Sequence, residues 1–206
     1  METYTSEDEQ VDAVRRFFAE NGKALAAGIV IGLVGLLGWK YWNSHKESTL
    51  FQASSQYETV SAKLADVKTD NSAEAEKFIK ANSNSYGVFA SLQLAQRSAK
   101  AGDFKKAAEL LQVAQGQTSD ESLLSLVTLR LARVQLQNKQ PDDALKTLEK
   151  VKGEGWLAQA DDVRGDILLN KGDLKGAKEA YSKGIESNAT EALQALLRMK
   201  LNNLSS

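Results

Sequence analysis

The chain has 206 residues, with 26 basic and 27 acidic side chains and a formal net charge of −1. This balance gives no reason to expect a nucleic-acid partner. The absence of cysteine excludes disulfides, thiol catalysis and thiolate metal sites. Ala, Leu, Glu, Lys and Gln dominate, and Pro141 is the single proline. Because these are good helix formers, we expect an all-α protein.

The first segment, residues 1–23, is predicted to be a tail that contains a short amphipathic helix. Ser6 followed by Glu9 fits a capping box at the start of that helix. Four apolar residues would then share one face: Val11, Val14, Phe17 and Phe18.

The second segment, residues 24–42, reads ALAAGIVIGLVGLLGWKYW and is uncharged until Lys40. It has the roughly 20 residues that a helix needs to cross a bilayer. A cleaved signal peptide would have a shorter apolar core and a small-residue cleavage site, whereas WKYWNSHK follows here. A buried soluble helix would be weakened by the four glycines, which are common in membrane helices. We therefore interpret this segment as a single transmembrane helix.

Small residues recur every four positions along this segment, at Ala24, Gly28 and Gly32. Such a seam allows a second helix to pack closely against it in the membrane. The alternative, that these glycines only face lipid, stays open because a short pattern of this kind is weakly specific.

Basic residues flank the transmembrane segment unequally. Arg15, Arg16 and Lys23 lie on its amino-terminal side, against Lys40 at its far end and Lys46 just beyond it. Positive residues favour the cytoplasmic side, so we expect a cytoplasmic amino terminus. Residues 43–206 would then lie on the opposite side of the membrane.

A repeated pattern dominates the rest of the chain. Helices are predicted at 47–67 and 72–82, and from there a similar turn recurs, beginning at Gly102, Gln140 and Gly172. The alanines that follow these turns are 37 and 33 residues apart: Ala107, Ala144 and Ala177. Small residues also stand in the preceding helices, where two backbones approach each other: Ala95, Ala132 and Gly165. The spacing resembles the 34-residue tetratricopeptide repeat.

This resemblance predicts an α-solenoid of helical hairpins, with repeats near 88–121, 125–156 and 158–190 and a capping helix at 191–204. The pattern departs from the repeat where a large aromatic residue is expected. Those positions hold Ser91, Thr128 and Asp161.

No catalytic constellation is evident. His45 is the only histidine, and without a second ligand we interpret it as a surface residue. Asp161, Asp162 and Asp166 cluster on one predicted helix, either as a solvated face or as carboxylates in a groove. We expect neither enzymatic activity nor a metal or cofactor.

The remaining candidate is the concave face formed by the first helix of each repeat, which binds peptide segments in repeats of this type. The corresponding positions here are Phe89, Leu92, Gln96, Leu126, Leu129, Arg133, Leu136, Asp162, Asp166 and Leu169. The leucines among them have two open interpretations, as groove lining or as core of a tight stack.

The whole chain resembles the YfgM family of ancillary subunits of the bacterial SecYEG translocon. The resemblance rests on METYTSEDEQVDAVRRFFAENGKAL, GWKYWNSH and KGEGW. It implies a single-pass inner-membrane protein with a periplasmic repeat domain. Its implied partners are the SecYEG translocon, the membrane-anchored periplasmic chaperone PpiD, translocating polypeptide clients and a cytoplasmic stress-response regulator.

Two other functions compete with a role in handing clients to chaperones. One is a structural scaffold that stabilises a membrane complex without binding clients. The other is an enzyme or receptor whose repeat domain binds a solute or lipid.

Overall fold

The computed structural model describes residues 7–66, 68–187 and 189–204, with the side chains of residues 7–10 and 13 excepted. The predicted capping box of Ser6 and Glu9 lies outside these described residues. The chain divides into two compact units, Met1–Gln52 and Ala53–Ser206.

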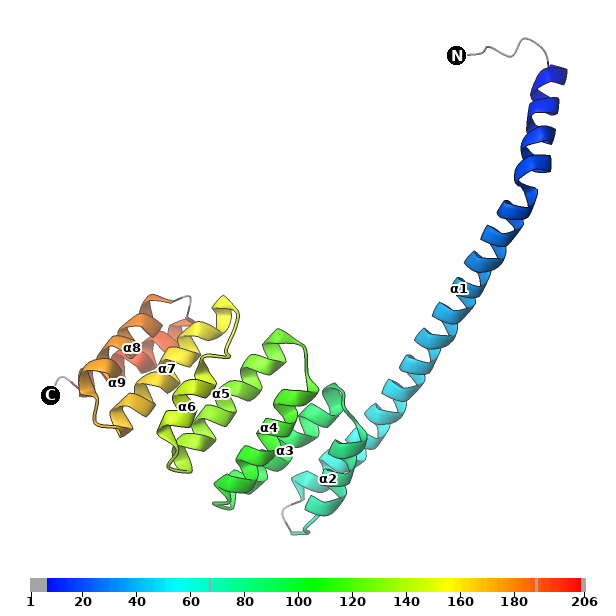
Figure 1. The fold of residues 1–206 in the computed structure, drawn as a ribbon. Helices are drawn as coiled ribbons and strands as arrows, with labels where there is room; N and C mark the ends of the chain where they lie inside the picture. The colour runs from blue at the N-terminus through cyan, green and yellow to red at the C-terminus, as the bar shows by residue number, and fades with distance from the viewer. Residues whose placement is uncertain (1–6, 67, 188, 205–206) are drawn as a thin grey trace. The chain divides into compact units, whose positions relative to one another are not determined.

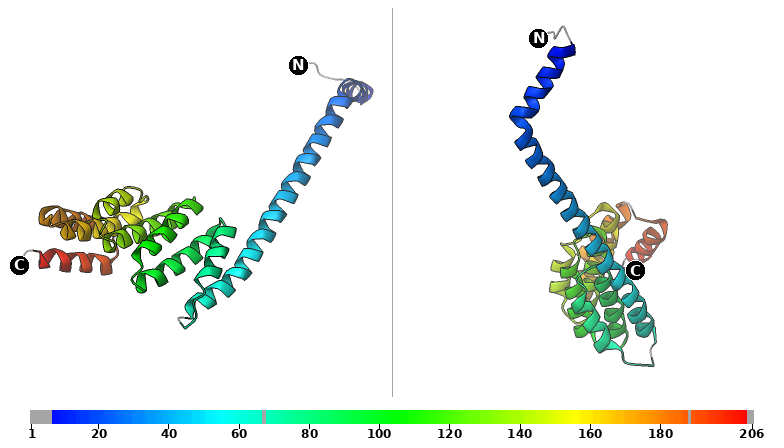
Figure 2. Two further views of the ribbon diagram at one scale, coloured as in Figure 1. Left: turned by 60° about the horizontal axis from the view of Figure 1, so that its bottom comes forward. Right: turned by 90° about the vertical axis from the view of Figure 1, so that its right-hand side faces the viewer.

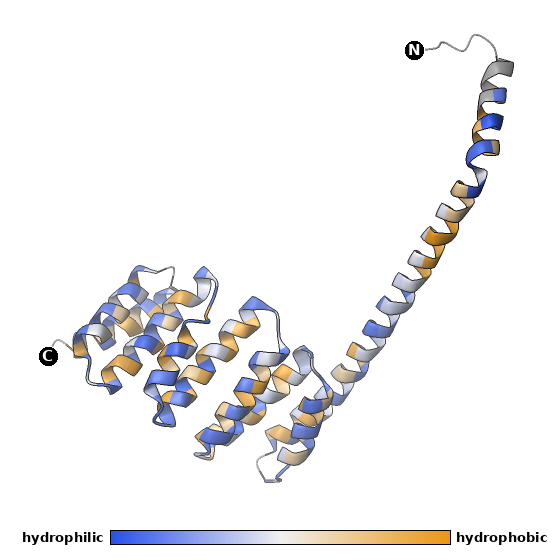
Figure 3. Ribbon diagram, viewed as in Figure 1, coloured by the Kyte–Doolittle hydropathy of each residue, from blue (hydrophilic) through white to orange (hydrophobic). Residues whose placement is uncertain are grey.

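The first unit consists of most of helix α1, Glu7–Ala65. The amphipathic helix, the apolar segment and the helix predicted at 47–67 join into this one helix. No proline stands in α1, and the glycines in it weaken a helix without ending it. Figure 3 shows the apolar run of α1. Its side chains are exposed: Ile31 has 73% of its surface exposed and Leu36 has 67%. None of this apolar window is buried, which disfavours the alternative of a buried soluble helix.

The second unit contains the end of α1 and eight shorter helices that the structure describes (Figure 1). These are α2 Ser72–Ala81, α3 Ser85–Lys100, α4 Phe104–Gln117, α5 Glu121–Gln137, α6 Pro141–Leu148, α7 Glu154–Asn170, α8 Leu174–Glu186 and α9 Glu191–Asn203. Figures 1 and 2 show α3–α8 as a row of helical hairpins with α9 against the last of them. No strand occurs among the described residues.

The hairpins pack as a solenoid. α3 packs on α4, α5 on α6 and α7 on α8, and each hairpin contacts the next. The first helices also touch one another further along, α5 on α7 and α7 on α9. α5 is consequently buried on two faces, with Val127 and Leu131 in one hydrophobic core and Leu129 and Ala132 in the next. A helix between two neighbours in a stack has to be apolar nearly all round.

The three turns inside the hairpins are built alike. Each turn places one residue in the left-handed region, Gly102 at φ +82°, Lys139 at +59° and Gly172 at +81°. The next amide donates to a carbonyl five residues earlier, for example Asp103 N to Ser98 O and Asp173 N to Leu168 O, both at 2.9 Å. This pattern ends a helix by satisfying its last carbonyls. The recurrent turns found in the sequence are therefore helix stops.

The predicted small residues stand where the helices of each hairpin meet. Ala107, Ala144 and Ala177 are fully buried, as is Ala132. At the positions where the repeat usually has a large aromatic residue, Ser91, Thr128 and Asp161 are also buried. The departures from the repeat pattern thus put polar atoms inside the stack.

Candidate functional site

The small-residue seam lies on the exposed surface of α1. A Cβ atom added to Gly28 or Gly32 would meet nothing within 4 Å, and Ala24 is exposed. The surface is therefore open to a partner helix or to lipid. Its role in helix packing remains a prediction.

The groove positions on α3 and α5 differ in accessibility. Phe89, Gln96 and Arg133 are exposed, and Leu126 and Leu136 are partly buried. Leu92 and Leu129 have only 6% and 2% of their surface exposed, because each packs into a hydrophobic core. For Leu129, the structure favours the interpretation as core over the one as groove lining.

On α7, the groove positions are mostly occupied by an ion-pair network. Lys200 of α9 lies 2.6 Å from Asp162 Oδ1 and 2.6 Å from Asp166 Oδ1. Arg133 of α5 reaches Asp162 Oδ2 at 3.4 Å, and the Tyr181 hydroxyl donates to Asp166 Oδ1 at 2.7 Å. These carboxylates therefore do not form the solvated face proposed above. Leu169, one turn further on, is exposed.

The contacts in this network raise the pKa values of two of its members, Lys200 and Tyr181. Burial lowers the pKa of the Lys200 ammonium, but its hydrogen bonds to Asp162 and Asp166 outweigh that effect and the pKa is raised. Burial, together with the bond to Asp166, raises the pKa of the Tyr181 hydroxyl. Lys200 therefore stays charged and Tyr181 stays neutral at physiological pH.

Asp161 stands apart from this network. Its Oδ1 atom has two distant cationic neighbours, Lys183 Nζ at 3.7 Å and Arg164 Nε at 3.8 Å. Its Oδ2 atom is buried without a hydrogen-bond partner. Burial raises the pKa of the Asp161 carboxyl above its usual value.

Four aromatic rings meet where α1, α2 and α3 come together, a cluster that the sequence analysis did not predict. Tyr57 lies 5.7 Å from Tyr86, 6.1 Å from Phe89 and 6.4 Å from Phe78 between ring centroids. Phe89 is the most exposed of the four. The partners of Tyr57 lie on two other helices, α2 and α3, so the sequence carried no signal of this cluster.

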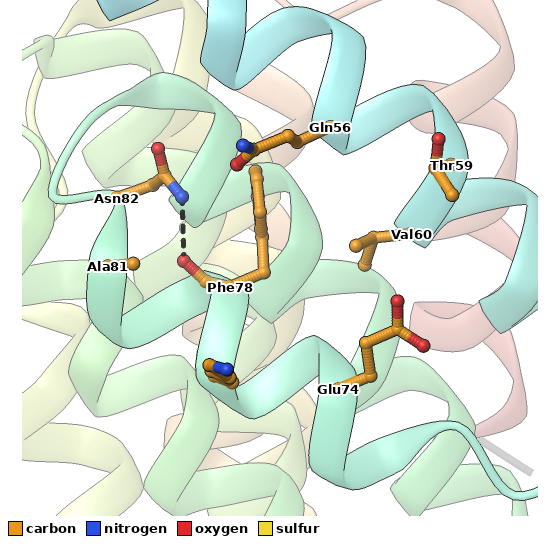
Figure 4. Close-up of a pocket in the computed structure, with 8 residues that line it drawn as sticks. Gln56, Thr59, Val60, Glu74, Phe78, Ala81 and Asn82 are labelled. Atoms are coloured by element: carbon orange, nitrogen blue, oxygen red, sulfur yellow. Dashed lines mark hydrogen bonds between the residues drawn. The ribbon is translucent and has the colours of Figure 1, made fainter.

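A pocket of about 340 Å³ lies between α1 and α2 (Figure 4). In Figure 4, Gln56, Thr59 and Val60 of α1 face Glu74 and Phe78 of α2. At one end of α2, the Asn82 side-chain amide donates to Phe78 O at 2.9 Å. Glu74 in this lining forms an ion pair with Lys63 of α1 at 2.7 Å, which ties the two helices together beside the pocket.

Metal-binding geometry is missing from the described residues, which hold no group of three His, Asp or Glu side chains suited to an ion. His45 is exposed and its ring stacks on Tyr41 at 6.5 Å between centroids. It has no carboxylate or second imidazole as a described neighbour.

The fold and the exposed apolar helix define a class, a helical-repeat protein with one helix suited to a membrane. α1 is the one described helix that is long and apolar enough to cross a bilayer. The family model for the tetratricopeptide repeat-like domain matches residues 15–206. None of the solved structures matches the chain.

Comparison with curated relatives identifies a family within this class. The chain is 50% identical over 205 residues to the ancillary SecYEG translocon subunit of Escherichia coli K12, with 100% of both chains covered. It is 38% identical to the protein of that name in Haemophilus influenzae and 39% identical to the one in Aggregatibacter actinomycetemcomitans. Each match covers 98% of this chain and 99% of the relative. The chain belongs to the family of ancillary SecYEG translocon subunits.

Proposed function

We propose that this protein is a single-pass subunit of the SecYEG translocon in the inner membrane that passes secreted or outer-membrane proteins to periplasmic chaperones. The observation that supports this most is the 50% identity, over both full chains, to a relative named as such a subunit. The exposed apolar stretch of α1 supplies an anchor, and the solenoid of the second unit supplies a surface for polypeptide.

The proposed orientation places the amino terminus in the cytoplasm and residues 43–206 in the periplasm. Three basic residues on the amino-terminal side of the anchor, against two at and beyond its far end, support this orientation. Protease added to spheroplasts is expected to degrade the chain after Lys46 and to spare the amino-terminal tail. The reverse digestion pattern would contradict this topology.

The proposed partners are the translocon, the chaperone PpiD and polypeptides in transit, and the cytoplasmic tail is proposed to restrain a stress-response regulator. A photo-crosslinking residue at Phe89 or Leu169, both exposed groove positions, should capture translocating chains in intact membranes. A matched residue at Glu109, exposed on α4, serves as the control and should capture few.

A purely structural scaffold is the second candidate, because the exposed seam at Gly28 and Gly32 leaves room for another helix. A scaffold would recover its membrane partners through α1 and bind no client. Pull-downs with the full chain and with residues 53–206 distinguish the two functions. If residues 53–206 recover neither a client nor a chaperone, scaffolding is the better account.

A further inference from the structure

A second pocket, of about 280 Å³, opens between α3, α4 and α5. Its floor is apolar and is formed by Leu92 and Ala95 of α3 and Leu111 of α4, all buried. Its rim carries the exposed side chains of Arg130 and Arg133. Small-molecule sites typically enclose about 300–1,000 Å³, so this pocket is sized for one or two apolar side chains.

The packing of the first helices explains why a pocket forms here. α5 packs on α7 and α7 on α9, whereas α3 and α5 have no comparable contact in the described part of the chain. Small side chains contribute as well, since Ala95 and Ala99 of α3 face the pocket opposite Val134 of α5. An opening between the first and second repeats results.

The rim of this pocket is cationic. None of the described residues that line it carries a carboxylate. Arg133 has half of its side chain exposed, and its one described ion pair, to Asp162, is long at 3.4 Å. A guanidinium forms planar, paired hydrogen bonds with a carboxylate, so two exposed arginines beside an apolar floor complement an acidic ligand that carries an apolar group.

We propose that this pocket binds an acidic polypeptide segment, with one apolar side chain on the floor and flanking carboxylates on Arg130 and Arg133. The inference rests on the proposed function, because it specifies which polypeptides the repeat domain holds. The apolar floor favours a peptide over a phosphate group, which would gain nothing from Leu92 and Leu111. Free phosphate is therefore an outcome that the test must exclude.

The test uses the full-length protein in detergent micelles and three fluorescent peptides of one length. The first has a leucine between aspartates, the second has lysines in place of the aspartates, and the third has serine in place of the leucine. Fluorescence anisotropy should show that the first peptide binds at least about tenfold more tightly than either of the others. Inorganic phosphate at the same ionic strength as a chloride control should not displace it.

Two variants locate the binding to this pocket. Ala99→Leu fills the pocket, and Arg130→Glu reverses a charge on its rim. Each substitution should lower the affinity for the acidic peptide by at least about tenfold. Arg198→Glu is the matched control, because Arg198 is exposed on α9 and does not line the pocket. Arg198→Glu should change the affinity for the acidic peptide by less than about twofold. A thermal melt checks folding, and Arg130→Glu, at an exposed position, carries the test if Ala99→Leu unfolds.

Equal binding of the acidic and basic peptides, displacement by phosphate, or full affinity in Arg130→Glu would overturn the inference. These results leave the proposed function standing as long as crosslinks from Phe89 or Leu169 still capture translocating chains. If the crosslinks were lost as well, both the inference and the proposed function would be overturned.

Discussion

The ring of Tyr181 on α8 fills the space that a side chain at Gly165 on α7 would occupy. A Cβ atom on Gly165 would lie 2.8 Å from Cζ of Tyr181 and closer still to two other ring carbons. Tyr181 is 1% exposed, and its hydroxyl donates to Asp166. The third hairpin is therefore closed by a tyrosine that packs onto a bare backbone.

The first prediction follows from this contact. Gly165→Ala should lower the free energy of unfolding by about 1–3 kcal/mol, because the added methyl group displaces the ring. Chemical denaturation of residues 53–206, which contain the three described cores, measures the change. Gly155→Ala is the control, since a Cβ there meets nothing within 4 Å. Equal effects of the two substitutions would show that the ring can move aside freely.

Leu129 should behave as a core residue. Leu129→Ala removes a buried side chain from the second core and should cost about 2–5 kcal/mol in unfolding free energy. Leu169→Ala, at an exposed groove position on α7, should cost less than about 1 kcal/mol. Thermal melts of the two variants, compared with the unsubstituted domain, check this. A Leu129→Ala domain that melts normally would restore the interpretation of Leu129 as groove lining.

A substitution in the second hairpin turn should stabilise the fold. Lys139 adopts φ +59°, where the other two turns have glycine. A side chain in this region strains the backbone, so Lys139→Gly should raise the unfolding free energy by up to about 1 kcal/mol. The reciprocal change, Gly102→Lys, should lower it by a similar amount. If both substitutions shift the melting temperature in the same direction, strain at Lys139 is not the cause.

Asp161 should make stability depend on pH. Its pKa is raised by burial, so the folded state holds a proton that the unfolded state has lost. Stability is therefore expected to fall as pH rises from the usual aspartate value of about 3.9 to the raised value, and to be level above it. Asp161→Asn should melt above the unsubstituted domain at pH 7, and the difference should shrink towards pH 4.

An exposed aspartate gives the matched control for this pH series. Asp142 pairs with Lys171, and that hydrogen bond lowers the pKa of Asp142. The effect of Asp142 on folding stability is therefore opposite in sign to that of Asp161. The ion pair stabilises the fold at pH 7, and this stabilisation is lost on acidification. Asp142→Asn should therefore melt slightly below the unsubstituted domain at pH 7. Melts between pH 4 and 7 that show the same sign for both variants would refute the assignment to burial.

The seam on α1 predicts a defect in assembly. Replacing Gly28 and Gly32 by leucine should reduce recovery of the membrane complex while leaving insertion intact, because leucine is apolar but blocks close helix approach. Val30→Leu is the control, since Val30 lies two residues from each glycine and so about 200° around the helix. Affinity purification from solubilised membranes measures recovery. Unchanged recovery in the glycine variant would mean that the seam faces lipid.

The sequence alone predicted the all-α class and the hairpins of the second unit, although the three helical segments predicted before residue 68 join into the single helix α1. An uncharged run long enough to cross a bilayer predicts a membrane helix from composition, and α1 is long and apolar enough to be one. Turn residues at a regular spacing mark the hairpins, because stopping a helix is a local event that one left-handed residue and its neighbours complete. The small residues near 95, 132 and 165 likewise follow from the spacing at which two helices must approach.

Only the tertiary structure decided which faces of these helices are accessible. From the sequence, Asp162 and Asp166 could face solvent or a groove. In the structure, α9 brings Lys200 to them, although Lys200 lies 38 and 34 residues further along the chain. Leu129 became core because α5 packs on α7, and the pocket near Arg130 opened because α3 does not pack on α5 to the same degree. Side-chain period shows which residues share a helix face, but the neighbour that covers that face depends on packing between distant segments.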